Sequence, residues 1–309
     1  MKADRLKKLK LKLILSIVSP ILIVSLIIFS LSPTGKNFIK SFYLNLELED
    51  FRGYSENYDY SVTFFDVETS DCSLIKIKDK YVLVDTSDPL NADYIKLTLK
   101  SANIDHLEAI FISHFDTDHS GSLLSIIEEI GVNCVYFPSF SNPYNRNFIE
   151  IKEFLDEHST EYKFLSSCDK IKIGESEFLI YGPVNEYSST NENSLVFTFK
   201  ANDFKVLFTG DMEQKELSDI LKLDVNLDCD VLKVSHHGSI NGISDEFLIK
   251  ASPEFSVISV GTNSSGLPNQ DTIELLKESG TEILRTDAKG IITIASNTND
   301  TNIYLKTFK

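Results

Sequence analysis

The sequence predicts an α/β fold in which two β-sheets pack face to face with helices outside them, an αββα sandwich preceded by one N-terminal transmembrane helix. Three observations support this prediction. The middle of the chain is rich in strand-like segments, strands and helices alternate in its later part, and polar residues directly follow several apolar strands. Residues 13–31 contain no charged side chain and are long enough to cross the apolar core of a bilayer, about 30 Å thick.

The first 58 residues are predicted to hold the protein at a membrane. Residues 1–12 form a basic cytoplasmic tail, residues 13–32 the anchor, and residues 33–58 an acidic and aromatic tether. Basic residues stay on the cytoplasmic side of a membrane. We therefore expect a single-pass protein of the cell membrane, with a cytoplasmic N-terminus and an extracellular globular domain. A cleaved signal peptide, with a weak cleavage site near Pro33, is the alternative.

The globular domain is predicted to span residues 59–309, and its elements follow from the spacing of apolar residues. Alternating apolar and β-branched residues indicate strands, whereas apolar residues three and four positions apart indicate helices. In the first half we expect strands at 61–67, 73–77, 81–86, 107–114 and 132–138, and helices at 91–103 and 120–131. In the second half we expect strands at 170–174, 177–183, 230–236, 255–261, 282–286, 291–296 and 302–308, a hairpin at 193–211, and helices at 212–221, 244–251 and 271–279.

Charge and cysteine content limit the possible partners. The chain has a formal net charge of −16, and it is more acidic still without its basic tail. Such a field repels polyanions over about 8–10 Å in physiological salt. DNA or teichoic acid would therefore need a local basic patch or bound cations to approach. The chain has no C-x-x-C pair, which argues against a structural zinc site. Disulfides and isolated buried thiols both remain open.

The six residues from His114 to His119, HFDTDH, contain two histidines and two aspartates. The apolar strand before them ends at His114, and a tight turn before the next helix can direct all four side chains into one space. Imidazole and carboxylate ligands suit zinc, manganese or iron. The alternative is a helix-capping residue beside two incidental histidines.

Three other strand ends favour the metal site. Asp85 ends the strand YVLVDT, Asp211 ends VLFTGD, and the pair His236-His237 ends VLKVS. Sheet folds commonly present functional groups at such positions. Each residue has a plain structural explanation when taken alone, as a turn residue or a helix cap. Four such strand ends in order are better explained by a shared site.

This order of motifs resembles the metallo-β-lactamase superfamily. More narrowly, it resembles the C-terminal hydrolase-like domain of the ComEC competence DNA-uptake proteins, in which H-x-D-x-D-H replaces H-x-H-x-D-H. The similarity extends over residues 62 to about 295, in the segments FFDVETSDCSLIKI, YVLVDT, NENSLVF, VLFTGD, VLKVSHHGS, SVGTNSSGLP and RTDAKGIITI. Two departures concern loops that contact substrate. Glu68-Thr69-Ser70 replaces a glycine-rich turn, and Leu267 replaces a histidine.

The resemblance implies two divalent metal ions, Mn²⁺ or Zn²⁺. His114 and Asp116 would hold one ion, and Asp118 and His119 the other. Asp211 would bridge both, and His236, in preference to His237, would complete the second set. The oxygen ligands tilt the preference toward manganese.

The resemblance also implies roles beyond the ligands. Asp118 and His237 would act in catalysis, with His237 free to contact the substrate. Asp85 would orient a metal-binding side chain through a hydrogen bond. Asn191 and Ser194, which match an N-x-x-S motif, would bind substrate together with Thr86.

These implications lead to an expected function. We expect a membrane-anchored extracellular metal-dependent hydrolase, a phosphodiesterase or nuclease that uses a hydroxide bound between two metals. Its substrate would be DNA or a cell-surface polymer. With one membrane span, the chain would need a separate DNA-uptake channel for any part in transformation. The alternatives are a cell-surface phosphoester hydrolase, acting on phosphorylcholine or teichoic-acid esters, and a non-catalytic metal-binding module.

Overall fold

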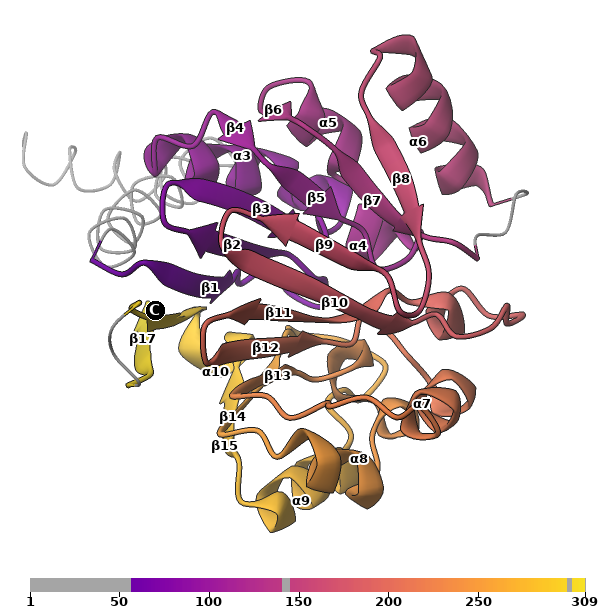
Figure 1. Cartoon of the computed structure of the whole chain (residues 1–309), viewed down its shortest axis with the longest axis vertical. Coiled ribbons are helices and arrows are strands. Elements are labelled where there is room, and N and C mark those ends of the chain that lie inside the picture. The colour runs from indigo at the N-terminus through magenta and orange to yellow at the C-terminus, as the bar shows by residue number, and fades with distance from the viewer. Residues whose placement is uncertain (1–56, 141–144, 299–301, 309) are drawn as a thin grey trace, which may run out of the picture. The chain divides into compact units, whose positions relative to one another are not determined.

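Two β-sheets lie face to face in the computed structural model, which describes residues 57–140, 145–298 and 302–308. Helices cover the outer face of each sheet (Figure 1), so the predicted αββα sandwich is confirmed. The predicted basic tail, the anchor and nearly all of the tether lie outside the described residues. Within the three described ranges, no helix is both long and apolar enough to cross a bilayer.

The first sheet has eight strands and changes from antiparallel to parallel pairing at β3. In spatial order its strands are β17 (Tyr304–Phe308), β16 (Ile291–Ser296), β1 (Tyr60–Phe64), β2 (Ser73–Ile77), β3 (Lys80–Val84), β5 (Ala109–Phe111), β7 (Val135–Pro138) and β8 (Tyr162–Leu165). β17 to β3 pair antiparallel, and β3, β5, β7 and β8 pair parallel. The connections that parallel pairing requires carry helices.

The elements that connect the strands of the first sheet are mostly short. They are η1 (Pro89–Asn91), α3 (Ala92–Ser101), α4 (Thr117–Ser120), α5 (Leu123–Ile127) and α6 (Arg146–Glu157), with a two-stranded ribbon of β4 (His106–Leu107) and β6 (Gly131–Val132). α6 has a side-chain cap, because Asn145 accepts a hydrogen bond from the amide of Phe148. It buries Ile151 and Leu155, which lie four positions apart on one face.

The second sheet has seven strands and the same mixed pairing. In spatial order they are β15 (Glu282–Arg285), β14 (Phe255–Ile258), β13 (Val231–Lys233), β12 (Phe204–Phe208), β11 (Val196–Ala201), β10 (Ser176–Gly182) and β9 (Lys170–Ile173). β12 to β15 pair parallel, and β9 to β12 pair antiparallel. The remaining elements are η2 (Asn191–Asn193), α7 (Gln214–Leu221), η3 (His236–Gly238), η4 (Ile240–Gly242), α8 (Asp245–Ala251), α9 (Gln270–Ser279) and α10 (Thr286–Lys289).

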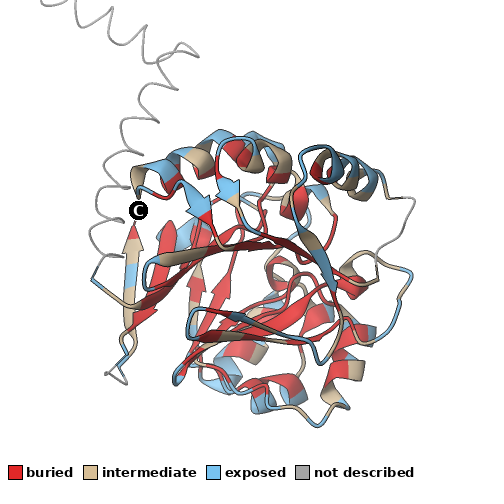
Figure 2. Ribbon diagram, turned by 45° about the horizontal axis from the view of Figure 1, so that its top comes forward, coloured by how far each residue is buried: buried red, intermediate tan, exposed pale blue. Residues whose placement is uncertain are grey.

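Aromatic side chains form the centre of the layer between the sheets. Phe111 of the first sheet stacks on Phe178 of the second at 4.8 Å between ring centroids, and Phe197 stacks on Phe208 at 5.1 Å. Burying such large apolar side chains is the main favourable contribution to folding. Figure 2 shows the consequence: the central strands are buried, the edge strands β8, β9 and β17 are partly exposed, and the helices expose their outer faces.

Most predicted elements are confirmed within a few residues, and the differences have local causes. The helix expected at 120–131 is two short helices, α4 and α5, because the chain turns at Gly121 and Ser122. A side chain at Gly121 would meet Pro89 at 2.4 Å, so this close approach requires glycine. The structure adds α6, β8 and α10, which the apolar pattern did not predict.

All four cysteines are free thiols. Cys72, Cys134 and Cys229 are buried, and Cys168 is exposed. The disulfides left open by the sequence are therefore excluded in this structure, and isolated thiols are confirmed.

Candidate metal centre

Four loops bring polar side chains to one edge of the sandwich. They follow β3 and β5 in the first sheet and β12 and β13 in the second. The members of each pair are parallel neighbours, so their carboxyl ends lie at the same edge of their sheet. Ligands commonly bind at the carboxyl ends of parallel strands. This topology explains why residues far apart in the sequence meet at one place.

The loop after β5 contributes His114, Asp116, Asp118 and His119. The rings of His114 and His119 are buried, and their centroids lie 4.2 Å apart. Asp116 precedes α4, and its carbonyl oxygen accepts the amide of His119 at 3.0 Å, which fixes the turn. The side chains of Asp116 and Asp118 are 40% and 38% exposed. This loop thus places two buried imidazoles beneath two half-exposed carboxylates.

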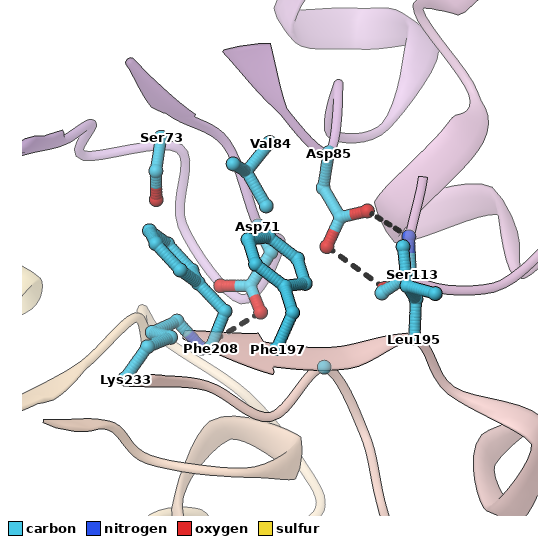
Figure 3. A pocket seen from close by; sticks show the side chains of 10 residues that line it. Asp71, Ser73, Val84, Asp85, Ser113, Leu195, Phe197, Phe208 and Lys233 are labelled. Carbon is cyan, nitrogen blue, oxygen red and sulfur yellow. Dashed lines mark hydrogen bonds and ion pairs between the residues drawn. The ribbon is translucent and has the colours of Figure 1, made fainter. Parts of the chain in front are cut away.

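Asp85, at the end of β3, holds the ring of His119. Its Oδ2 lies 2.9 Å from His119 Nδ1, and it also accepts hydrogen bonds from the amide and hydroxyl of Ser113 at 2.7 and 2.9 Å (Figure 3). The Nδ1 atom of His119 is therefore the donor to Asp85. This is the contact predicted for a residue that orients a ligand. Burial alone would lower the pKa of His119, but Asp211 and Asp85 raise it well above its usual value, so a metal at Nε2 would displace a proton.

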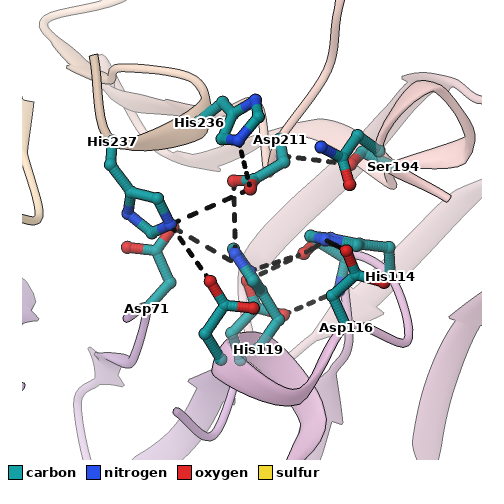
Figure 4. Close-up of polar contacts among 12 residues, drawn as sticks. Asp71, His114, Asp116, His119, Ser194, Asp211, His236 and His237 are labelled. Atoms are coloured by element: carbon teal, nitrogen blue, oxygen red, sulfur yellow. Dashed lines mark hydrogen bonds and ion pairs between the residues drawn. The ribbon is translucent and has the colours of Figure 1, made fainter. Parts of the chain in front are cut away.

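The loop after β12 places Asp211 opposite the two histidines. Its Oδ1 lies 3.2 Å from His119 Nε2, and its amide donates to Ser194 Oγ at 3.0 Å (Figure 4). Gly210 before it has a φ of +48°, and a side chain there would come within 2.8 Å of Ser113. Glycine is required at this position because the two sheets approach closely here.

The adjacent histidines after β13 differ in orientation. Both adopt a left-handed backbone, with φ of +47° and +52°. His237 is buried, and its Nδ1 lies 3.0 Å from the carbonyl oxygen of Ser259, so Nδ1 must donate there. Its Nε2 then faces Asp118 Oδ2 at 3.4 Å and Asp211 Oδ2 at 3.8 Å.

His236 lies farther out. Its side chain is 26% exposed, and its Nε2 lies 3.7 Å from Asp211 Oδ2. Its Nδ1 lies 3.4 Å from Glu213 Oε1. Both members of the pair therefore reach Asp211, but only His237 has a carbonyl partner that fixes its tautomer.

Three groups of donor atoms in the described residues each lie within 4.8 Å of one another. They are His114, His119 and Asp211; Asp118, His119 and His237; and Asp71, Asp85 and His119. Asp116 and His236 belong to none of them. Asp116 Oδ2 nevertheless lies 3.7 Å from His114 Nε2.

The donor atoms fit a divalent cation. The Nε2 atoms of His114, His119 and His237, and Oδ1 of Asp211, are buried and form no well-aligned hydrogen bond, although imidazole and carboxylate atoms face one another at 3.2–3.8 Å. A buried polar atom without a partner is costly, and native proteins leave few of them. Imidazole nitrogens mixed with carboxylate oxygens are ligands that zinc and manganese accept.

Burial and neighbouring charged groups determine the pKa values of the buried residues. Burial, with His119 beside it, lowers the pKa of His114 to about 3, so its imidazole is neutral. Burial alone would raise the pKa of Asp211, but His119 and His237 hold that pKa well below its usual value. Metals bind neutral imidazole and ionised carboxylate, which are the forms favoured for these two residues.

The residues predicted to bind substrate are placed differently from one another. Thr86 is fully buried and donates to the carbonyl oxygen of His119 at 3.1 Å. Ser194 is also fully buried against the amide of Asp211. Asn191 is partly exposed at the start of η2.

Sequence reasoning did not select Asp71, Ser113, Lys233 or Glu213, all of which lie beside these groups. Asp71 and Lys233 lie within the segments FFDVETSDCSLIKI and VLKVSHHGS, so their place in those segments was an available signal. Nothing in the local pattern marks Ser113 or Glu213.

The sequence matches the metallo-beta-lactamase superfamily over residues 65–262. It is 27% identical over 198 residues to ComE operon protein 3 of Bacillus subtilis (strain 168), which covers 63% of this chain and 25% of that protein. It is also 27% identical over 237 residues to the competence protein ComA of Neisseria gonorrhoeae, covering 75% of this chain and 32% of that protein. The chain thus spans about a quarter to a third of the length of these relatives.

Two solved structures show the same fold. The metallo-beta-lactamase fold protein YhfI from Bacillus subtilis superposes with a TM-score of 0.51 at 12% identity, covering 76% of this chain and 100% of that one. CmlA, a diiron beta-hydroxylase from Streptomyces venezuelae, superposes with a TM-score of 0.53 at 13% identity, covering 77% and 54%. At identities this low, the superpositions show the shared fold alone.

Proposed function

Because this chain belongs to the metallo-β-lactamase superfamily, we propose that it is a metal-dependent phosphodiester hydrolase. The observation that carries the proposal is the set of buried Nε2 atoms of His114, His119 and His237, without well-aligned hydrogen bonds, around the carboxylate of Asp211. A non-catalytic metal-binding module would need the same ligands. The half-exposed carboxylates of Asp116 and Asp118 favour catalysis, because they leave the centre open to solvent and substrate.

The proposed ligands divide between two ions. His114 and Asp116 would hold one ion, and Asp118, His119 and His237 would hold the other, while Asp211 lies within reach of His119 and His237. We propose His237 as the ligand in place of His236, because its hydrogen bond to Ser259 fixes Nδ1 as the donor and directs Nε2 inward, toward Asp118 and Asp211. When bound there, two divalent cations would supply Lewis-acid chemistry, lowering the pKa of water and neutralising charge on phosphoryl oxygens.

The surrounding residues hold the ligands in place. Asp85 fixes the ring of His119, Thr86 fixes its carbonyl oxygen, and Ser194 fixes the amide of Asp211. Thr86 and Ser194 therefore support ligand-bearing segments in this proposal. Substrate contact is left to His236 and Asn191, which reach the surface.

The substrate class is proposed from the relatives and from charge. Similarity to two competence proteins supports DNA as substrate, with a separate uptake channel as partner. The net charge of −16 repels DNA and teichoic acid alike, so it favours the second candidate, a hydrolase of cell-surface phosphoesters, in the form that acts on phosphorylcholine esters. For both candidates we propose anchoring by residues 13–32, with the catalytic domain outside the cell.

The test uses the whole chain loaded with Mn²⁺. Bound Mn²⁺ per chain is measured first, followed by cleavage of single-stranded DNA and of a small aryl phosphodiester. Asp118→Ala removes a proposed ligand, and Asp203→Ala in the β11–β12 turn is the matched control. We expect Asp118→Ala to weaken metal binding and to lose cleavage, and Asp203→Ala to keep both.

The outcome also separates the candidate substrates. DNA cleavage that depends on Asp118 supports the nuclease, and turnover of the small diester alone directs the search to cell-surface polymers. Protein that holds its Mn²⁺ and cleaves neither substrate contradicts phosphodiester hydrolysis.

A further inference from the structure

A buried ion pair joins the two sheets beneath the candidate metal centre. Lys233, the last residue of β13, places Nζ 2.7 Å from Oδ2 of Asp71, which lies between β1 and β2 (Figure 3). The two side chains are 3% and 5% exposed. A buried ion pair adds little stability relative to apolar side chains of similar volume, because both charges lose their hydration. Its presence here therefore favours a role other than stabilising the fold.

Asp71 is connected to the ligands of the first sheet. Its amide donates to the carbonyl oxygen of Asp118 at 3.0 Å, and its Oδ2 lies 3.9 Å from Nδ1 of His119. Its own carbonyl oxygen accepts the amide of Ser87 at 2.8 Å. Movement of Asp71 would thus shift the backbone that carries two proposed ligands.

Lys233 is connected to the ligands of the second sheet. Its carbonyl oxygen accepts the hydroxyl of Thr209 at 2.6 Å, two residues before Asp211. Its Nζ also donates to the carbonyl oxygen of Val234 at 3.2 Å, on the segment that leads to His237. A further backbone bond joins the amide of His236 to the carbonyl oxygen of Gly210 at 3.1 Å. The loops after β12 and β13 therefore form one unit around Lys233.

The space beside the ion pair is too small for a substrate. Asp71, Asp85, Ser113 and Lys233 line a cavity of about 10 Å³, about the minimum for one water molecule. Lys233 therefore cannot touch a phosphodiester, and it acts through the residues that it holds. An additional cation bound by Asp71, Asp85 and His119 is disfavoured, because the ammonium of Lys233 already occupies Oδ2 of Asp71.

We propose that the Asp71–Lys233 pair is a positioning device that fixes the separation between the ligands of the first sheet and those of the second. Asp118 and His119 come from one sheet, whereas Asp211 and His237 come from the other. An ion held by both groups binds tightly only when their separation is correct. The inference rests on the proposed function, since it concerns the same metal centre.

The experiment measures Mn²⁺ binding to the whole chain by calorimetry. Electron paramagnetic resonance of the loaded protein reports whether two ions lie close together. Lys233→Met removes the charge and keeps the length of the side chain. Lys205→Met is the matched control. Lys205 lies on β12 of the same sheet as Lys233, and it forms a partly exposed ion pair with Asp228. The double variant Asp71→Asn/Lys233→Met removes both charges, so it leaves no unpaired charge if the single variant fails to fold.

We expect Lys233→Met and the double variant to bind one Mn²⁺ about 10–100-fold more weakly, the usual cost of losing a residue that orients a ligand. In both variants the paramagnetic resonance signal of two neighbouring ions should also weaken. Lys205→Met should bind Mn²⁺ with wild-type affinity. Wild-type affinity in either folded variant overturns the inference while leaving the proposed function intact. A wild-type chain that binds no Mn²⁺ instead overturns the proposed function, and the inference with it.

Discussion

The two groups of proposed ligands are built in different ways. The first sheet supplies His114, Asp116, Asp118 and His119 from a single turn, held by hydrogen bonds within the loop and by Asp85. The second sheet supplies Asp211 and His237 from two strand ends, each fixed by a partner elsewhere in the fold, Ser194 and Ser259. The residues of the first group are therefore brought together by one local turn, which tertiary contacts then support, whereas those of the second group meet only in the tertiary structure. Substitutions should therefore disturb the geometry of the second group more easily than that of the first.

Asp211→Asn should have the largest effect, because Asp211 lies where the two groups meet. Its carboxylate faces His119 at 3.2 Å and His237 at 3.8 Å. We expect metal affinity to fall by more than about 100-fold, the upper range for residues that only orient ligands. Calorimetry with Mn²⁺ measures the loss. Asp203→Asn is the control, and wild-type metal content in Asp211→Asn would show that the groups do not share this residue.

Separate alanine variants of His236 and His237 would sharpen the comparison within the second group. We expect the metal affinity of His237→Ala to be about 10–100-fold lower than that of the wild type. His236→Ala should lose less than about 10-fold, because its ring is partly exposed and has no carbonyl partner. Mn²⁺ titration of both variants decides the assignment. A larger loss in His236→Ala would restore the preference drawn from sequence resemblance.

The sequence was informative where neighbouring residues determine structure. Alternation in β1 to β3 and the apolar face of α9 predicted those elements, and the six-residue spacing in the loop after β5 predicted a cluster of polar side chains. The orientation of His236 and His237 was not predictable, since it depends on two consecutive left-handed residues and on Ser259. The contact between Asp71 and Lys233 spans 162 positions and two sheets, so no local pattern encodes it.

Asp85→Asn would test how firmly the first group is held. Asp85 accepts hydrogen bonds from Ser113 and from Nδ1 of His119, and an amide has only one oxygen with which to replace them. We expect metal affinity about 10-fold lower, the lower range for such partners, because the local turn still places the ring. The same titration measures it, with the surface variant Asp156→Asn on α6 as the control. A loss as large as that of Asp211→Asn would contradict the view that the first group is held locally.

Glu216→Gln should have the smallest effect, and it concerns stability near the second group. Glu216 on α7 is fully buried, and neither carboxylate oxygen has a hydrogen-bond partner. Burial, with Glu192 nearby, raises its pKa well above the usual value. Between the ordinary and the raised pKa, the unfolded chain releases this proton and the folded chain keeps it. Stability contributed by Glu216 is therefore complete at low pH and falls as the pH rises, by at most about 1.4 kcal/mol per unit.

Glutamine at position 216 stays neutral at every pH, so this part of the pH dependence should disappear. Urea unfolding of the metal-free chain from pH 4 to pH 8 measures the slope for both proteins. The control is Glu157→Gln, at the exposed end of α6, which should keep the wild-type slope. An unchanged slope in Glu216→Gln would show that Glu216 is ionised in the folded protein.

The buried thiol of Cys72 can report how often the interior next to Asp71 opens to solvent. The thiol follows Asp71 directly, is 1% exposed, and has a pKa raised well above normal by burial. A soluble thiol reagent can therefore modify it only during an opening of the interior. With the exposed Cys168 replaced by serine, and with reclosing faster than modification, the labelling rate follows the population of the open form. Buried Cys134 and Cys229 lie elsewhere in the fold, so the order in which the three thiols react would show which part of the interior opens first.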